Sequence, residues 1–305
     1  MAAFLLKRVL HGFVVLWVVA TLTFILLRLA PGGPFDRERK LPPEVMANIE
    51  AKYHLDEPPL QQYFRYLSGM LRGDLGPSYK YLDRRVNEII ADSLPTSAIL
   101  GGLAVLFALA VSFPAGIVSA YYRHSVIDRC CMFFATLGIS VPHFILGASL
   151  IWALALQLGW LQPGRWDEPS SAILPTVTLG AAPAAYLAAL LRSTMIETLT
   201  EDFIRTARAK GVTERAVVLK HALRHSLIPV VTVMGPLTAA LLTGSFVVEY
   251  VFAIPGMGRF FITAVTDRDY PLIMGVTLVY TVVLVCANLL VDLLYGYIDP
   301  RIRTD

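Results

Sequence analysis

Six long apolar blocks, none of which contains a Lys, Arg, Asp or Glu, constrain the fold of this 305-residue chain more than any other feature. A helix needs about 20 predominantly apolar residues to cross roughly 30 Å of hydrocarbon, and one charge at mid-span costs about 2.5–3.5 kcal/mol. The blocks cover residues 9–27, 95–122, 130–157, 172–191, 226–248 and 270–291. The sequence therefore predicts an all-α, polytopic membrane protein with six transmembrane helices.

The composition agrees with this prediction. Hydrophobic residues make up 56% of the chain and charged residues 16%, against roughly 45–50% and 25% in soluble domains. The net charge of +3 is small and does not indicate a nucleic-acid partner. Cys130, Cys131 and Cys286 form neither a disulfide framework nor a metal-ligand pattern. We therefore expect no metal site in this chain.

The positions of Lys and Arg in the short loops predict the orientation. With a cytoplasmic N-terminus, the inner face carries Lys7, Arg8, Arg123, Arg129, Arg192, Arg205, Arg208, Lys210, Arg215, Lys220, Arg224, Arg301 and Arg303, and the short outer loops carry only Arg165, Arg259 and Arg268. Outer loop 31–94 is long, and long loops are translocated largely regardless of charge. Both termini are therefore predicted to be cytoplasmic.

The first apolar block could be a cleaved signal peptide or a retained anchor. It is longer than the 7–15 residues of a signal-peptide core. Pro31 directly follows Ala30, which makes a poor cleavage site. We interpret residues 1–30 as a retained transmembrane helix.

Loop 31–94 contains two helical patterns, which begin at Pro42-Pro43-Glu44 and at Pro58-Pro59. The first places Val45, Ile49 and Tyr53 on one face, and the second places Leu60, Tyr63, Phe64, Leu67 and Leu71 on one face. Gly73 is expected to end the second helix. These helices either pack on the outer ends of the spans or form a docking surface for an external partner.

Pro114, Pro142, Pro183 and Pro236 fall within the predicted spans. Each removes a backbone hydrogen bond and bends its helix, and in lipid such breaks persist only where neighbours or a cavity satisfy the freed groups. The prolines are either ordinary kinks or part of a transport pathway. The Ile254–Gly258 segment, between the fifth and sixth blocks, is either a tight turn or a re-entrant gate. The candidate pathway or gate residues are Pro142, His143, Pro183, Pro236, Gly256 and Gly258.

The basic segment 193–225, between the fourth and fifth blocks, is predicted to form two short helices. Thr200 is the expected N-cap of the first helix, and Gly211 is its expected stop. Thr213 is the expected N-cap of the second. The segment could lie on anionic lipid or form a rigid elbow that inserts into a cytoplasmic partner.

This segment contains the string Phe203-Ile-Arg-Thr-Ala-Arg-Ala-Lys-Gly211, which is followed by nine residues and by His221-Ala-Leu-Arg224. In this pattern it resembles the signature loop of binding-protein-dependent ABC importer permeases. The family pattern is Glu-Ala-Ala, three residues, Gly, nine residues, and Ile-x-Leu-Pro. Ala207, Gly211 and Leu223 match it, whereas Arg205, Thr206, His221 and Arg224 depart from it, so the acidic anchor of the family is missing here.

Other strings extend the resemblance over nearly the whole chain and favour the peptide and nickel branch, with most similarity to the B subunit of oligopeptide permeases. They are Leu29-Ala-Pro-Gly32, Leu41–Leu55, Gly73–Tyr79, Gly244–Glu249, Ile254–Gly258, Asp267–Tyr270 and Tyr297–Arg301. The resemblance implies a type I ABC importer permease fold in a bacterial inner membrane. It divides the chain into helix 1–30, outer loop 31–94, a five-helix core at 95–298 with coupling loop 193–225, and a tail at 299–305.

The resemblance also implies that this chain is a transport subunit without an ATPase site of its own. Its expected partners are a second similar permease, two ATP-binding subunits that hold ATP and Mg, an external peptide-binding protein and membrane lipid. The chain itself has no Gly-x4-Gly-Lys-Ser/Thr phosphate loop. The implied coupling residues are Asp202, Phe203, Arg205, Thr206, Ala207, Arg208, Ala209, Lys210, Gly211 and His221.

Three alternatives remain beside the oligopeptide permease. A dipeptide or nickel permease would use the same scaffold. An intramembrane enzyme would need paired acids or an acid–histidine cluster at one membrane face, whereas His143 stands alone in its span. A proton-coupled carrier would need a second buried acid beside Asp292.

Overall fold

The computed structural model describes residues 2–35, 43–81, 83–242 and 246–298, and the secondary structure in these ranges is helical apart from an isolated β-bridge between Pro77 and Arg85. Three predicted features lie outside the described residues: tail 299–305, the Pro42 helix start, and positions 243–245 near the end of the fifth block.

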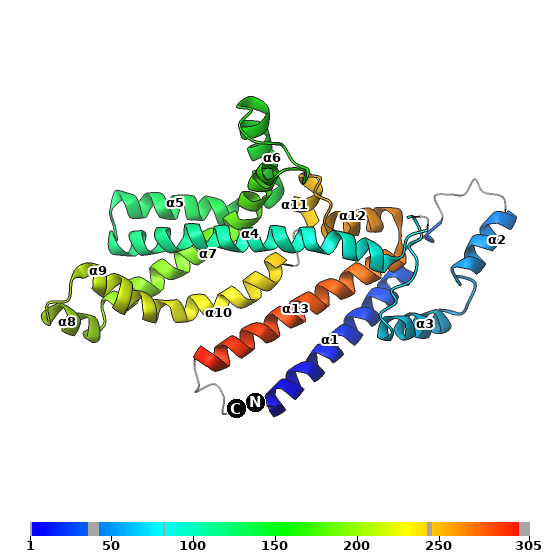
Figure 1. Cartoon of the computed structure of the whole chain (residues 1–305), viewed down its shortest axis with the longest axis horizontal. Coiled ribbons are helices and arrows are strands. Elements are labelled where there is room, and N and C mark those ends of the chain that lie inside the picture. Colours follow the sequence, from blue (N-terminus) through cyan, green and yellow to red (C-terminus); the bar gives the residue numbers. More distant parts are fainter. Residues whose placement is uncertain (1, 36–42, 82, 243–245, 299–305) are drawn as a thin grey trace. The chain divides into compact units, whose positions relative to one another are not determined.

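The chain forms two compact units. The first unit comprises residues 1–97 and 255–286, and the second comprises residues 98–254 and 287–305. The first contains α1 (Ala2–Leu29), α2 (Pro43–Lys52), α3 (Pro59–Leu71), the start of α4 (Val86–Tyr121), α12 (Met257–Asp267) and most of α13 (Tyr270–Ile298). The second contains the rest of α4, α5 (Val126–Ser140), α6 (His143–Leu150), η2 (Ile151–Gln157), η3 (Pro169–Ala172), α7 (Ile173–Leu199), α8 (Asp202–Ala209), α9 (Glu214–Ala216), η4 (Val217–Ala222), α10 (Leu223–Leu242) and α11 (Phe246–Val251) (Figure 1).

Five helical stretches are long and apolar enough to cross a membrane, and they coincide with five of the six predicted blocks. They are Leu6–Leu29, Val86–Tyr121, Pro169–Leu199, Glu214–Val251 and Tyr270–Leu290. The fourth predicted span ends too early at Leu191, because α7 continues to Leu199. The prediction of a multi-pass, all-α membrane protein is confirmed.

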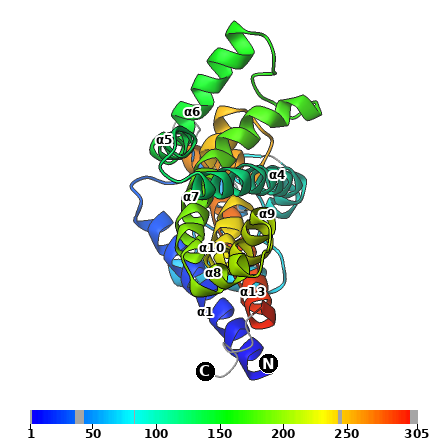
Figure 2. The ribbon, with the colours of Figure 1, turned by 90° about the vertical axis from the view of Figure 1, so that its left-hand side faces the viewer.

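The third predicted block is a broken span. Helix α5 ends at Ser140, and the following pair of α6 and η2 is bent from it by 109°; Figure 2 shows α6 running away from α5 at this point. Val141 has extended backbone, with ψ of 120°, because a proline disfavours the helical conformation of the residue before it. Pro142 has ψ of 140°, so neither residue continues the helix. The bend that the sequence predicts at Pro142 is thus confirmed, and it is sharp enough to divide the block into two helices. The block reaches the length of a span if the bent pair counts as one.

The second unit is organised around α7, which packs against both α5 and α10. Small residues allow the close approach: Ala184, Ala185 and Ala188 of α7 are buried. A Cβ atom on Gly138 of α5 would lie 3.0 Å from the Ala185 Cβ atom. The alanine cluster thus serves helix packing, as small residues commonly do in membranes.

In the first unit, α1 and α13 approach each other at Gly12, where a Cβ atom would lie 2.8 Å from the Val285 side chain. Helix α3 ends as predicted, because Gly73 (φ 73°) and Asp74 donate to the carbonyls of Met70 and Gly69.

Only part of the apolar face predicted for α3 is packed, because Tyr63 and Leu67 are partly buried while the other three residues are exposed. Leu60, Phe64 and Leu71 are 65%, 60% and 80% exposed, while Gln62 is buried. Tyr63 instead joins α3 to α1, since its hydroxyl lies 2.7 Å from the Thr21 Oγ1 atom. A sequence pattern identifies an apolar face, but it does not tell whether protein or lipid covers that face.

Candidate coupling site

Helix α8 is a short helix whose end is fixed by a glycine. The N–H groups of Gly211 and Val212 donate to the carbonyls of Arg208 and Ala207, at 3.0 and 3.2 Å. These two bonds form the motif in which the residue after the helix adopts a left-handed conformation. Gly211 has φ 79°, where an L side chain would be strained. The predicted stop at Gly211 is confirmed.

The start of α8 lies one residue later than predicted. Thr200 is the C-cap of α7, and its hydroxyl donates to the Glu197 carbonyl at 2.7 Å. Glu201, with extended backbone, is the N-cap of α8. The predicted cap at Thr200 is therefore wrong, because α7 extends to Leu199, into the first part of the segment 193–225 that the sequence assigned to the loop.

One side of α8 is anchored in the second unit. Ile204 is fully buried and Ala207 is 8% exposed. Both belong to a cluster that includes Leu191 and Met195 of α7 and Val217 of η4. Seven of the ten predicted coupling residues lie on the opposite, exposed side or at the helix end: Asp202, Phe203, Arg205, Thr206, Arg208, Ala209 and Lys210. Ala207 faces the chain's own core.

The second predicted short helix of the elbow does not exist as a separate element. Thr213 occupies the N-cap position, as predicted, but α9, η4 and α10 form one continuous helical stretch from Glu214 to Leu242. Pro229 lies inside α10, where it has no N–H group to donate to the preceding turn. His221 therefore lies in the π-helical segment η4 and not in a loop.

Polar contacts join α8 and its neighbours across the elbow. Arg208 Nε donates to Glu214 Oε1 at 2.7 Å and so links α8 to α9. Ser226 of α10 donates to the Thr198 hydroxyl of α7 at 3.0 Å. The elbow is thus held at both ends by the long helices α7 and α10 (Figures 1 and 2).

The predicted pathway residues of the second unit lie on three packed helices. His143 Nδ1, at the start of α6, donates to the Thr178 carbonyl of α7 at 3.0 Å. Pro183 follows five residues later in α7, and Pro236 lies on an exposed part of α10. His143 therefore connects the second half of the broken span to the central helix.

Gly256 and Gly258 lie in the first unit, buried at the start of α12. Gly256 is the N-cap of that helix, and the next N–H group, from Met257, donates to Ser97 Oγ at 2.9 Å. The preceding Ala253 has φ 51°, and Ile254 donates back to the Glu249 carbonyl at 2.8 Å. In this structure the segment is a tight turn that joins α11 to α12, and its role as a gate stays a prediction.

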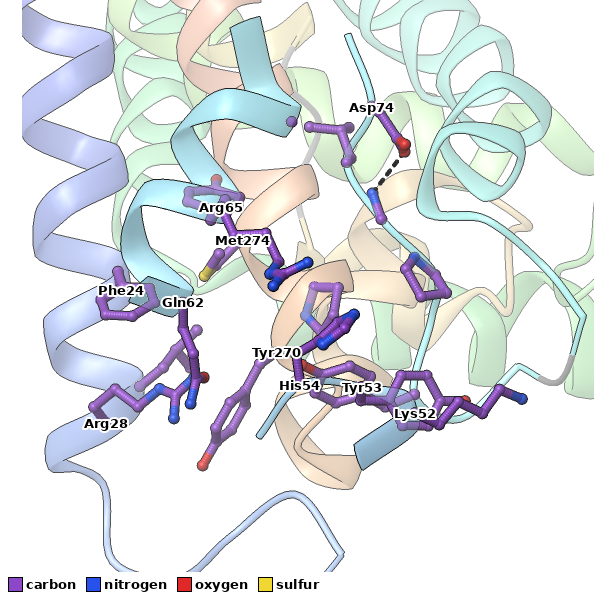
Figure 3. A pocket seen from close by; sticks show the side chains of 18 residues that line it. Phe24, Arg28, Lys52, Tyr53, His54, Gln62, Arg65, Asp74, Tyr270 and Met274 are labelled. Atoms are coloured by element: carbon purple, nitrogen blue, oxygen red, sulfur yellow. Dashed lines mark hydrogen bonds between the residues drawn. The ribbon is translucent and has the colours of Figure 1, made fainter. Parts of the chain in front are cut away.

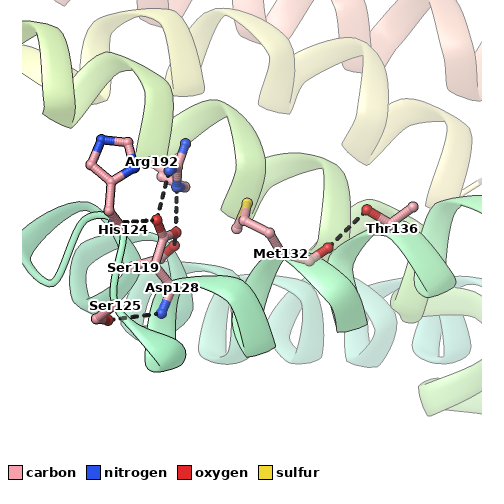
Figure 4. Close-up of polar contacts among 7 residues, drawn as sticks. All are labelled: Ser119, His124, Ser125, Asp128, Met132, Thr136 and Arg192. Carbon is pink, nitrogen blue, oxygen red and sulfur yellow. Dashed lines mark hydrogen bonds and ion pairs between the residues drawn. The ribbon is translucent and has the colours of Figure 1, made fainter.

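Sequence reasoning missed a buried ion pair between Asp128 of α5 and Arg192 of α7 (Figure 4). Arg192 Nε and Nη2 donate to the two carboxylate oxygens at 2.6 and 2.8 Å. The Asp128 side chain is 5% exposed, and it also accepts from the Ser119 hydroxyl and the His124 N–H group. The only signal was local: Ser125 and Asp128 have capping-box spacing at a helix start.

Comparison with known proteins places this architecture in a family. Residues 112–304 match the family described as binding-protein-dependent transport system inner membrane component. Residues 1–101 match the N-terminal membrane component of such systems.

Two relatives match over nearly their whole length. The oligopeptide transport system permease protein OppB of Haemophilus influenzae is 45% identical over 305 residues, which cover 99% of this chain and 100% of the relative. The dipeptide transport system permease protein DppB of Bacillus subtilis is 44% identical over 303 residues, with 99% and 98% coverage.

The fold resembles that of a solved transporter. An inward-facing structure of the MetNI methionine ABC transporter matches 69% of this chain and 96% of its own chain, with a TM-score of 0.57 and 19% identity. At this identity the likeness concerns the fold alone. The chain has the fold of a type I ABC importer permease, and it belongs to the family of binding-protein-dependent transport system inner membrane components.

Proposed function

We propose that this chain is the permease subunit of an ATP-driven oligopeptide importer, that it forms half of the translocation pathway, and that α8 couples the pathway to an ATP-binding subunit. The coupling role rests on one observation, which is that α8 has one buried side and one exposed, polar side. Ile204 and Ala207 anchor the helix in the second unit, and the opposite face turns polar side chains outward. A helix attached in this way moves with α7 and α10 when a partner displaces it.

The chemistry of the exposed face of α8 defines the partner surface. It presents Lys210 and two ion pairs, Arg205–Asp202 and Arg208–Glu214, and Phe203, which is 39% exposed, adds an aromatic contact. Because Arg205 stands where the family has an acidic residue, docking here relies on a partner groove that offers acidic or carbonyl acceptors. Gly211 sets the shape of the elbow, and His221 supports it from η4.

The energy for transport comes from partner subunits in this proposal. The sequence contains no Gly-x4-Gly-Lys-Ser/Thr phosphate loop, so ATP and Mg are held by two ATP-binding subunits. A second, similar permease completes the pathway, and an external peptide-binding protein delivers the substrate to the outer face.

The oligopeptide substrate is supported by the OppB relative over its full length. The DppB relative, at 44% identity, favours a dipeptide importer as the second candidate. Uptake of labelled dipeptides and pentapeptides by cells that carry the assembled importer separates the two. An oligopeptide importer takes up the pentapeptide, and uptake of dipeptides alone would replace the first candidate with the second.

Substitution of Gly211 tests the coupling role. Gly211→Val imposes a side chain at φ 79°, and its Cβ atom would meet no atom within 4 Å. Gly159→Val is a matched control, because Gly159 has φ 63°, is exposed and also has no atom within 4 Å of a Cβ. Both changes add similar backbone strain, but only the first lies in the elbow.

We expect the Gly211→Val complex to remain in the membrane and to hydrolyse ATP with peptide uptake reduced at least about tenfold, since the elbow no longer fits its partner. The Gly159→Val complex should retain uptake. Equal uptake by the two variants would contradict the coupling role of the elbow.

A further inference from the structure

A cavity of about 300 Å³ lies within the first unit, between α1, α3, the 74–79 segment and the start of α13 (Figure 3). Its volume is at the lower end of the range of small-molecule sites. Figure 3 shows Arg28 and Gln62 on one side of the cavity and Tyr53 and Lys52 on the other. The coupling site and the predicted pathway residues contribute nothing to its wall.

The charged groups in the wall do not balance. Arg65 is paired with Glu57, and Asp74 is paired with Arg85 at 3.2 Å. Arg28, in contrast, contacts only neutral groups among the described residues: it donates to the Gln62 amide oxygen, and its guanidinium lies 5.2 Å from the Phe24 ring. Lys52 likewise lies against the Tyr53 ring. Among the described residues, no carboxylate pairs with Arg28 or Lys52, which are both exposed cationic side chains of this wall.

A buried hydroxyl in the same wall also lacks an acceptor. The Tyr66 hydroxyl is inaccessible to solvent and has no hydrogen-bond partner in the described part of the chain. Burial raises the pKa of Tyr66 well above its ordinary value, so the group stays a protonated donor. Burial also raises the pKa of Tyr79, another lining residue, to about 12, against the opposing effect of Arg28. A ligand that supplies several acceptor oxygens would satisfy this wall.

The apolar surface around the cavity places it at the edge of the hydrocarbon. Ile25, Leu26 and Leu29 at the outer end of α1 are 45%, 64% and 74% exposed. Leu60, Phe64 and Leu71 form the exposed apolar stripe of α3, which packs against α1 through Tyr63. A helix of this kind, beside the end of a span, lies in the membrane interface with its apolar stripe in the acyl chains.

We propose that this cavity binds the phosphate headgroup of a phospholipid from the outer leaflet. Arg28 donates to the phosphate oxygens, and rotation of the Tyr66 side chain, whose hydroxyl solvent does not reach in this structure, allows that hydroxyl to donate as well. Phe24 and Leu27 of α1 and Met274 of α13 line the apolar part of the wall and contact the glycerol and the upper acyl chains. A lipid suits this wall better than a free anion does, because the same cavity joins cationic donors to an apolar surface.

Native mass spectrometry of the full-length chain in detergent tests this site with three probes: dioleoyl phosphatidylglycerol, glycerol 3-phosphate and dioleoylglycerol. Arg28→Gln removes the cationic donor, and Tyr66→Phe removes the orphaned hydroxyl without removing an existing hydrogen bond. Arg72→Gln is the matched control, because Arg72 is exposed at the end of α3 and does not line the cavity. Thermal unfolding shows whether each variant is folded.

We expect one tightly bound phosphatidylglycerol on the native chain and on Arg72→Gln, and about tenfold weaker binding on Arg28→Gln, the loss typical of one charge-assisted hydrogen bond. Tyr66→Phe should weaken binding while leaving the unfolding midpoint unchanged. Equal lipid binding by Arg28→Gln and Arg72→Gln would overturn the proposal. Dioleoylglycerol binding as tight as that of the phospholipid would show that no phosphate is recognised, and equally tight glycerol 3-phosphate would identify a free-phosphate site instead.

Discussion

Arg192 of α7 holds Asp128 of α5 through a bidentate ion pair, although 64 residues separate them in the sequence. Asp128 also accepts a hydrogen bond from Ser119 near the end of α4. Helices α4, α5 and α7 are thereby joined on the side that the loop charges assign to the cytoplasm. The broken span that begins with α5 is therefore fixed to the central helix at one end by this pair.

The first prediction concerns this ion pair. Asp128→Asn keeps the shape of the side chain but leaves the Arg192 guanidinium without a carboxylate partner, and loss of one partner from a buried pair costs about 3–5 kcal/mol. Because Arg192 retains 24% exposure, we expect the lower part of that range. Thermal unfolding in detergent measures the change as a lower midpoint.

The exposed pair Arg205–Asp202 is the matched control for this measurement. Its N–O distance is 3.4 Å, and its side chains are 73% and 95% exposed, so solvent screens the interaction. Asp202→Asn should leave the midpoint unchanged. Similar destabilisation by both variants would show that Asp128 contributes no more than a surface charge.

Two adjacent glycines of α4 should respond to alanine with opposite signs. A Cβ atom on Gly101 would lie 2.4 Å from the carbonyl oxygen of Leu241 in α10, whereas one on Gly102 meets nothing within 4 Å. Gly101→Ala should therefore destabilise the protein by about 1–3 kcal/mol through overpacking. Gly102→Ala should stabilise it by up to about 1 kcal/mol through helix propensity. Unfolding midpoints of the two single variants provide the check, and the same sign for both would contradict this packing.

The buried carboxylate of Asp269 fastens the outer loop to α13. Asp269 is fully buried, and it accepts from the Ser78 hydroxyl and, at 3.1 Å, from the Tyr79 N–H group. Asp269→Ala removes these bonds, so we expect hydrogen exchange at residues 78–81 to accelerate, with a loss of about 1.5–3 kcal/mol for each hydrogen bond to a charged group. Asp267→Ala, which changes an exposed acid two residues away, should leave exchange in this segment as it is.

The buried side of α8, formed by Ile204 and Ala207, should contribute most of the stability of this helix. Ile204→Ala empties a fully buried position in the α7–η4 cluster, and such truncations cost about 2–5 kcal/mol. Limited proteolysis should then cut residues 200–213 faster than in the native chain. Phe203→Ala is the control, because this exposed side chain contacts only the His225 ring among the described aromatic pairs. We expect Ile204→Ala to be cut faster than Phe203→Ala. Equal rates of cleavage in the two variants would argue against an anchoring role of Ile204.

The sequence alone determined the membrane class, the helical fold and the position of most spans. Apolar blocks without charges admit few structures, because hydrocarbon leaves no partner for exposed backbone groups or charges. It also determined the ends of α3 and α8, since Gly73 and Gly211 supply a local conformation that other residues adopt only with strain. These features depend either on adjacent residues in the chain or on whether a segment is surrounded by hydrocarbon. The sequence shows the first directly and indicates the second through its apolar blocks.

Only the tertiary structure decided the features that depend on distant residues. The continuation of α7 to Leu199 and the exposure of Leu60, Phe64 and Leu71 on α3 follow from what packs against each helix. The partner of Asp128 and the cavity beside Arg28 are also tertiary, because each brings together side chains from separate helices. Sequence patterns report the polarity of a face and the local backbone preference, whereas the contact that satisfies a buried charge is fixed when the helices pack.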